Sequence, residues 1–219
     1  MYREVADDLS NIYTQSPIKK LLNIFYAMVL RHKKRTIEDF AQYVNGKTVA
    51  IVGNAASLLD KNLGKEIEEA EIVIRLNLGI VSTQSSQGSR CDILGISLPL
   101  DSEKVDSLFS PKYIIWLTPR TKHFSLRRRH HLMNTVIYPK FLWKKEFKKL
   151  SARPSSGYMV ISFLTEILKP KSIKVYGFDF AKSSSLTSPT RTKKAPHDFE
   201  KEKLIIQEKA RNGTLEICE

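Results

Sequence analysis

The stretch VAIVGNAASL at residues 49–58 joins an apolar, β-branched run to a glycine, an asparagine and several small residues. Such a run followed by a turn is typical of a buried strand that leads into a helix. In α/β proteins this junction is where nucleotides bind. The chain has neither a G-x-G-x-x-G pattern nor a P-loop lysine motif, so the turn at Gly53 and Asn54 does not favour a dehydrogenase or an ATPase.

Similar apolar runs recur and alternate with segments of helical periodicity. We predict strands at 48–52, 72–76, 93–97, 113–117, 135–138 and 173–176. We predict helices at 57–69, 140–150 and 157–168. This alternation predicts an α/β fold, a single Rossmann-like domain in which a mostly parallel sheet is flanked by helices.

The chain of 219 residues is long enough for one sizeable core. We predict an N-terminal basic, amphipathic helical region at 1–45 and the nucleotide-binding domain at 46–219. The polar, basic segment at 182–195 is predicted to be a mobile loop that closes over a substrate, or a disordered connection. The two cysteines do not make a disulfide framework, and residues 1–10 hold no apolar block, so we expect a reducing, cytoplasmic setting.

The charge pattern predicts a polyanionic partner without choosing among nucleic acid, anionic membrane and acidic small molecules. The formal net charge is +13. An apolar run within 18–35 lies between basic flanks, and its length of about ten residues is too short to cross a bilayer. It is predicted to lie in a membrane interface, or to be a core helix with charged ends. The basic, aromatic segment at 120–149 suits a membrane, nucleic acid or a solvated helix.

Polar residues follow three predicted strands at the edge of the sheet where ligands bind in this class of fold. Gly53 and Asn54 follow the first, Asn77 follows the second, and Gly-Phe-Asp at 177–179 follows the last. The turn at 153–157, RPSSG, precedes an apolar helix. It is either an anion site built from hydroxyls and backbone N–H groups or an ordinary serine N-cap.

The sequence gives little indication of a metal site. No histidine and cysteine cluster has zinc spacing, and the acids at 101–103 are a weak substitute for a D-x-D motif. Four histidines lie within basic clusters and are predicted to be on the surface: His32, His123, His130 and His131. His197 differs because it follows Pro196 and opens a helix-like segment with acids in its first turn. A lone histidine of this kind is more often structural than catalytic.

Taken in order, these pieces resemble the sialyltransferases over roughly 150 residues. The stretch from 49 to 77, with Val-Gly-Asn and Arg-Leu-Asn, is similar to the family's long nucleotide-binding motif. PSSG at 154–157, with the later Val-Tyr-Gly-Phe, is similar to the short motif. His-x-Phe-x-x-Glu-Lys at 197–203 is similar to the very short motif of one branch of the animal enzymes, and R-x-x-S-G at 153–157 to the bacterial form.

The resemblance implies a GT-A variant fold and an inverting, metal-independent transfer of a keto-sugar acid, sialic acid or a Kdo-like sugar, from a CMP-activated donor. His197 would be the general base, and an imidazole with its ordinary pKa of about 6.5 suits that task. Phosphate donors would replace a metal, so no cofactor is expected. The residues implied for the donor are Gly53, Asn54, Ala55, Asn77, Arg153, Ser155, Ser156, Gly157, Gly177 and Asp179, with Glu202 and Arg75 in support.

Departures from the family leave parts of this hypothesis open. Animal members carry a disulfide between the long and short motifs, and this chain has no cysteine there. The family's aromatic motif before the catalytic histidine is not visible. We therefore expect a bacterial protein at the inner face of the cytoplasmic membrane, acting on a glycan of surface polysaccharide or lipooligosaccharide. The alternatives are a basic nucleic-acid-binding protein and another nucleotide-using α/β enzyme.

Overall fold

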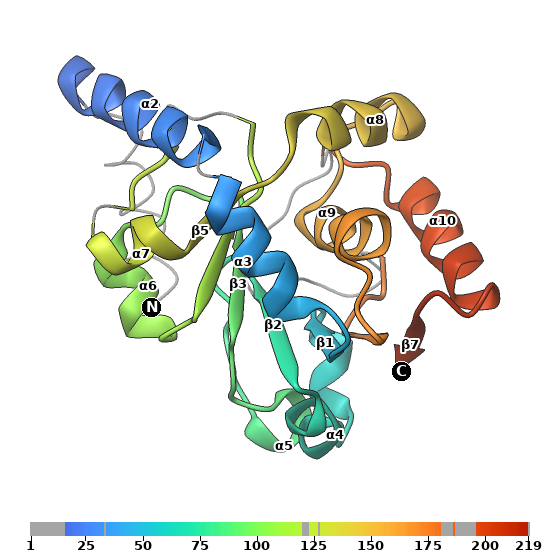
Figure 1. Ribbon diagram of the computed structural model, residues 1–219. Coiled ribbons are helices and arrows are strands. Elements are labelled where there is room, and N and C mark those ends of the chain that lie inside the picture. The colour runs from blue at the N-terminus through green and yellow to red at the C-terminus, as the bar shows by residue number, and fades with distance from the viewer. Residues whose placement is uncertain are drawn as a thin grey trace.

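The computed structural model describes residues 16–32, 34–119, 123–126, 128–180, 186 and 196–218. Its centre is a seven-stranded sheet in which every strand pairs with its neighbours in parallel, in the order β5-β4-β3-β2-β1-β6-β7 (Figure 1). The strands are β1 (Thr48–Val52), β2 (Ile72–Leu76), β3 (Ile93–Ile96), β4 (Tyr113–Trp116), β5 (Thr135–Ile137), β6 (Ser172–Tyr176) and β7 (Glu216–Cys218).

Helices cover both faces of the sheet, and successive strand residues alternate between the two layers. One core cluster joins one face to α3 (Lys34–Val44), α8 (Lys140–Leu150), α9 (Ser156–Phe163) with its π-helical end Leu164–Leu168, and α10 (Phe199–Arg211). Two further clusters join the other face to α2 (Pro17–His32), the 3₁₀ helix η1 (Ala56–Asp60), α4 (Gly64–Glu69), α6 (Ser102–Leu108) and α7 (Arg129–Asn134). The short α5 (Gln84–Gln87) follows β2.

The strand order places a switch point beside β1. From β1 the chain builds β2 to β5 on one side and later returns to add β6 and β7 on the other. Parallel sheets of this kind bind ligands beyond the carboxyl ends of their strands, near the switch. The loops that follow β1, β2, β3 and β6 are therefore the ones that position a site.

The predicted α/β fold is confirmed, and the six predicted strands each match within a residue. The strand β7, Glu-Ile-Cys, was missed because it is exposed or half-buried and holds a single β-branched residue, unlike the equally short but fully buried β5. The helix predicted at 57–69 is divided into η1 and α4 by an extended segment at Lys61. The helix predicted at 157–168 loosens into a π-helical turn after Phe163.

The predicted N-terminal region contributes to the same core as the rest of the chain. Phe40 and Val44 of α3 are fully buried in the largest cluster, where Phe40 contacts the rings of Tyr113 and Phe163. α2 continues along the edge of the domain. Of the loop predicted at 182–195 only Leu186 belongs to the described residues.

Candidate functional site

The loops after β1 and β6 approach each other so closely that only glycine fits between them. The Gly53 N–H donates to the carbonyl of Tyr176 at 2.8 Å, and that of Ala55 donates to the carbonyl of Gly177 at 3.4 Å. A Cβ on Gly53 would lie 2.3 Å from the Gly177 oxygen. Gly177 has φ +65°, a left-handed conformation that glycine adopts at little cost. The first predicted turn is thus fixed by backbone contact.

Asn54 lies at the carboxyl end of β1 and reaches the neighbouring strand. Its side-chain amide donates to the carbonyl of Leu76 at 3.1 Å, and its own carbonyl accepts from the N–H of Leu186 at 2.8 Å. The residue is half-buried, so one side of it meets solvent. It therefore links the ends of β1 and β2 to the segment that follows β6.

Asn77, at the end of β2, adopts φ +55°, a conformation that asparagine tolerates better than most residues. Its amide oxygen accepts from the N–H and the hydroxyl of Ser97 at 2.9 and 3.0 Å. Its amide nitrogen donates to the Ser156 hydroxyl at 3.3 Å, and the Ser97 and Ser156 hydroxyl oxygens lie 2.8 Å apart. These three side chains, with Asn54, form what we call the asparagine–serine cluster.

Ser97 is a member that sequence reasoning missed. It directly follows β3, at the same edge of the sheet as Asn54 and Asn77. The sequence prediction counted Ser97 as the last residue of the strand at 93–97, whereas β3 ends at Ile96. Its polar side chain at that strand end was the signal that could have found it, since the carboxyl ends of parallel strands share an edge.

The start of α9 brings the second predicted motif to this cluster. Ser155 is the N-cap, and its hydroxyl accepts from the N–H of Tyr158 at 3.2 Å. A Cβ on Gly157 would meet the ring of Phe178 at 2.4 Å, so glycine is required for Phe178 to pack there. The turn can be both a serine N-cap and an anion site, because a capped helix start still presents N–H groups beside Asn77.

Glu202 connects the third motif to the second. Its carboxylate accepts from the Ser155 N–H at 2.7 Å and from the Ser155 hydroxyl at 2.6 Å. Glu202 is buried in the first turn of α10, which is capped by Asp198. The position of α10 relative to α9 is therefore set at Ser155.

His197 lies just before α10 and is oriented by the backbone of Arg153. Its Nδ1 is 2.7 Å from the Arg153 carbonyl oxygen, and the Arg153 N–H donates to the carbonyl of Pro196 at 3.0 Å. Because a carbonyl can only accept, Nδ1 carries the proton and the neutral ring has its lone pair on Nε2. This is the tautomer in which Nε2 can take a proton from a substrate.

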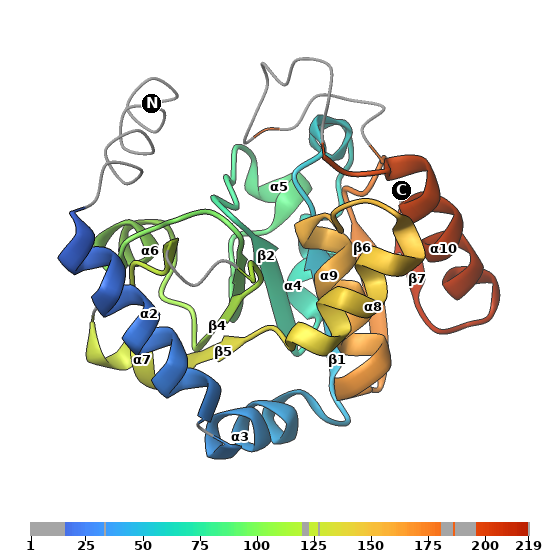
Figure 2. The ribbon, with the colours of Figure 1, turned by 90° about the horizontal axis from the view of Figure 1, so that it is seen from above.

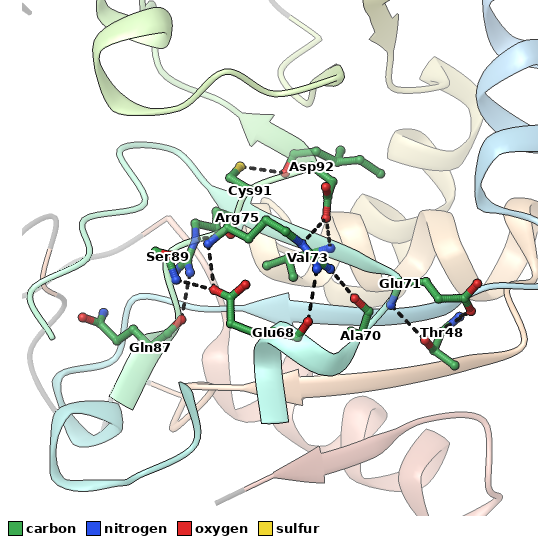
Figure 3. Close-up of polar contacts among 12 residues, drawn as sticks. Thr48, Glu68, Ala70, Glu71, Val73, Arg75, Gln87, Ser89, Cys91 and Asp92 are labelled. Atoms are coloured by element: carbon green, nitrogen blue, oxygen red, sulfur yellow. Dashed lines mark hydrogen bonds and ion pairs between the residues drawn. The ribbon is translucent and has the colours of Figure 1, made fainter. Parts of the chain in front are cut away.

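In the contacts of the described residues Arg75 does not reach the cluster, and Figure 3 labels it together with Glu68 and Gln87. Its side chain is almost completely buried and donates to the carbonyl of Arg90 from Nε and to that of Gln87 from Nη2, both at 2.8 Å. Burial lowers the pKa of this guanidinium. Nearby, the Glu68 carboxylate accepts from the N–H of Arg90 at 2.9 Å. Arg75 thus organises the segment after α5.

Gly177 and Asp179 line a hollow of about 220 Å³ beside the switch point, between η1 and α10. Asp179 accepts from the Ser57 hydroxyl at 3.1 Å. Lys61 and Lys203 also line this hollow, which gives it cationic groups next to one carboxylate. The predicted donor residues are therefore divided between the asparagine–serine cluster and this neighbouring hollow.

The prediction that His131 is on the surface is wrong. Its side chain is 2% exposed, and its Nε2 lies 2.9 Å from the Asp106 carboxylate of α6. Its neighbour His130 is exposed, as predicted. Together the three residues place possible metal-ligating atoms within 4.8 Å of one another, although Arg128 also pairs with Asp106. None of them touches the asparagine–serine cluster in any contact of the described residues.

Comparison with known proteins gives this arrangement a family context. The model for glycosyltransferase family 29 (sialyltransferase) matches residues 2–99, which include Asn54, Asn77 and Ser97. The predicted resemblance is thus confirmed. Over these residues the chain is similar to the sialyltransferases. No curated protein matches the sequence.

Solved structures extend the likeness in fold to nearly the whole sialyltransferase-like chain. A mammalian sialyltransferase in complex with Gal-beta-1-3GalNAc-ortho-nitrophenol is 15% identical, with a TM-score of 0.61 over 93% of this chain and 86% of that one. A second structure of a mammalian sialyltransferase is 16% identical, with a TM-score of 0.61 over 90% and 84% of the two chains. At this identity the matches establish the shared fold.

Proposed function

We propose that the chain transfers a keto-sugar acid, sialic acid or a Kdo-like sugar, from a CMP-activated donor to a hydroxyl of a glycan. The observation that carries this proposal is the convergence of three separate sequence motifs. Contacts lead from Asn77 to Ser156, and the adjacent Ser155 binds Glu202 of the helix that His197 precedes. The biological setting that we propose is bacterial surface polysaccharide or lipooligosaccharide synthesis.

The cluster offers neutral hydrogen-bond donors to a phosphodiester. The amides of Asn54 and Asn77 and the hydroxyls of Ser97 and Ser156 now bind one another or backbone carbonyls. The hydroxyls can rotate, and the 3.3 Å bond from Asn77 to Ser156 is long, so a ligand can exchange for these contacts. The N–H groups at the start of α9 add the partial positive charge that favours a phosphate.

The chemical step would be a single displacement. As the acceptor hydroxyl attacks the anomeric carbon of the keto-sugar, Nε2 of His197 takes its proton. The bond from that carbon to the phosphate oxygen breaks, and CMP leaves with the electron pair. Attack opposite the leaving group inverts the configuration, and donors around the phosphate stabilise the charge that develops there.

Metal independence is part of the proposal, and the role of Asp101 supports it. Asp101, the best candidate in the weak D-x-D-like segment, caps α6 by accepting from the Lys104 N–H at 2.8 Å. The reaction is therefore expected to proceed in EDTA.

Calorimetric titration tests the donor site first. CMP is added to the full chain in EDTA, with UMP and AMP as controls. We expect selective binding of CMP that Asn54→Ala and Asn77→Ala both weaken. Equal binding of the three nucleotides would instead favour another nucleotide-using enzyme. Tight, salt-dependent RNA binding without a CMP preference would favour the nucleic-acid alternative.

Transfer assays with CMP-sialic acid and CMP-Kdo then test the base. His197→Gln is expected to lower kcat about 10²- to 10⁴-fold while CMP affinity changes little. His130→Gln, an exposed histidine on α7, is the matched control and should keep the wild-type rate. An unchanged rate in His197→Gln would remove His197 from the mechanism.

A further inference from the structure

The helix α2 exposes a continuous apolar face to solvent. Ile18, Leu21 and Phe25 have 71%, 67% and 60% of their surface exposed. Residues three or four positions apart share one side of a helix, so these side chains form a stripe along it. Its other large members are Leu22, Met28 and Val29, with Ile24 at its margin.

The opposite face of α2 holds the helix to the domain. Asn23 and Leu30 are buried, and Tyr26 is half-buried against the cluster that includes Ile137 of β5. α2 therefore carries apolar side chains on two sides. One side packs against the domain, and the other, the stripe, is exposed to solvent. Contiguous exposed apolar surface of this kind marks an interaction site in a soluble domain.

Basic residues accompany the stripe. Lys20 is exposed on α2, and the sequence places further basic residues at 19 and 31–35. α8 lies on the same side of the molecule as α2, since both are in front in Figure 2 and along the upper edge in Figure 1. α8 exposes Phe141 and Phe147 together with Lys140, Lys144, Lys145, Lys148 and Lys149.

We propose that this face, α2 with the neighbouring surface of α8, binds an anionic lipid bilayer. α2 would lie parallel to the membrane with its stripe among the upper acyl chains, and the lysines would contact the acidic head groups. A second copy of the chain fits less well, because each copy carries a net charge of +13 and the same cations would meet across the contact.

The geometry favours a helix on the membrane rather than across it. α2 has 16 residues, which makes it about 24 Å long, against about 30 Å for the hydrocarbon core. Among the described residues, no helix is long and apolar enough to span a bilayer. Binding would thus be peripheral, and it does not depend on the proposed transferase activity.

Flotation of the full chain with lipid vesicles tests this surface. We expect binding to vesicles of phosphatidylcholine with 30% phosphatidylglycerol and much weaker binding to pure phosphatidylcholine. The variant Leu21→Gln/Phe25→Gln should lose more than tenfold in partitioning, because two large apolar side chains would no longer enter the acyl region. Both residues are exposed, so thermal unfolding should stay at the wild-type temperature.

Two further variants sharpen the test. Leu204→Gln replaces a similarly exposed leucine of α10 and should bind as wild type does. Lys148→Glu/Lys149→Glu should weaken binding to anionic vesicles and reduce its salt dependence. Wild-type protein that ignores anionic vesicles, or a stripe variant that binds as wild type does, would overturn the proposal. A wild-type dimer that the stripe variant dissociates, without vesicle binding, would assign the stripe to self-association.

Discussion

Glu202 accepts hydrogen bonds from both the backbone N–H and the hydroxyl of Ser155, at 2.7 and 2.6 Å, across 47 residues of sequence. This pair joins the first turn of α10 to the N-cap of α9. Ser156, the next residue, reaches Asn77. A carboxylate that could have been taken for a catalytic acid is thus engaged in positioning the helix start that the proposed donor would contact.

Replacing Glu202 by alanine should therefore impair both stability and CMP binding. The change leaves the partly buried Ser155 N–H without its acceptor, which costs about 1–3 kcal/mol of the free energy of unfolding. Urea denaturation measures this loss, and Glu200→Ala, an exposed acid in the same turn, is the control. In a double-mutant cycle with Ser155→Ala we expect a coupling energy of about 1 kcal/mol or more. Additive effects would show that the pair is not coupled.

Asn77 has two separable roles, one in its backbone and one in its amide. Asn77→Ala removes the amide and places alanine at φ +55°, whereas Asn77→Gly removes the amide without backbone strain. We expect the alanine variant to be less stable than the glycine variant by about 1–2 kcal/mol. CMP affinity should fall by the same factor in both, measured by calorimetry. A glycine variant that binds CMP as wild type does would exclude the Asn77 side chain from the donor site.

The six predicted strands were recognisable because each is a mostly apolar, β-branched run, and segments with helical periodicity separate most of them. The sequence pattern also located Gly53, Asn54 and Asn77, because the carboxyl ends of parallel strands lie at the same edge of the sheet. β5 and β7 both have three residues and lie at the two edges of the sheet, but only β5 is apolar enough to recognise. β7 is Glu-Ile-Cys and is exposed or half-buried, so no apolar run marks it.

Side-chain direction was harder to predict than strand position. Arg75 and Asn77 stand two residues apart, yet Arg75 donates to the segment after α5 while Asn77 turns toward α9. The positive φ of Asn77 breaks the alternation of the strand at that point. His131 was misplaced for a different reason: its sequence neighbours are basic, but its side chain is buried and pairs with Asp106 of α6, 25 residues earlier in the sequence.

The last prediction concerns the buried histidine of α7. Burial lowers the pKa of His131 below its ordinary value; Asp106 opposes this effect, while His130 and Arg128 add to it. The unfolded chain then binds a proton more readily than the folded one, so the stability is fully present above about pH 6.5. It falls as the pH drops from there toward the lower pKa of the folded state.

The free energy of unfolding, measured by urea denaturation between pH 7.5 and 5, should therefore decrease toward acid pH. His131→Gln can still donate to Asp106 but does not titrate, so its profile should be flatter in this range. His130→Gln alters the exposed neighbour and should keep most of the wild-type slope. Asp106 does not cause a slope between pH 7.5 and 5, because its pKa lies below the ordinary value of 3.8. Burial raises this pKa, and the neighbouring cations, His131 first among them, lower it by more. Parallel profiles for wild type and His131→Gln would show that the acid sensitivity arises elsewhere in the fold.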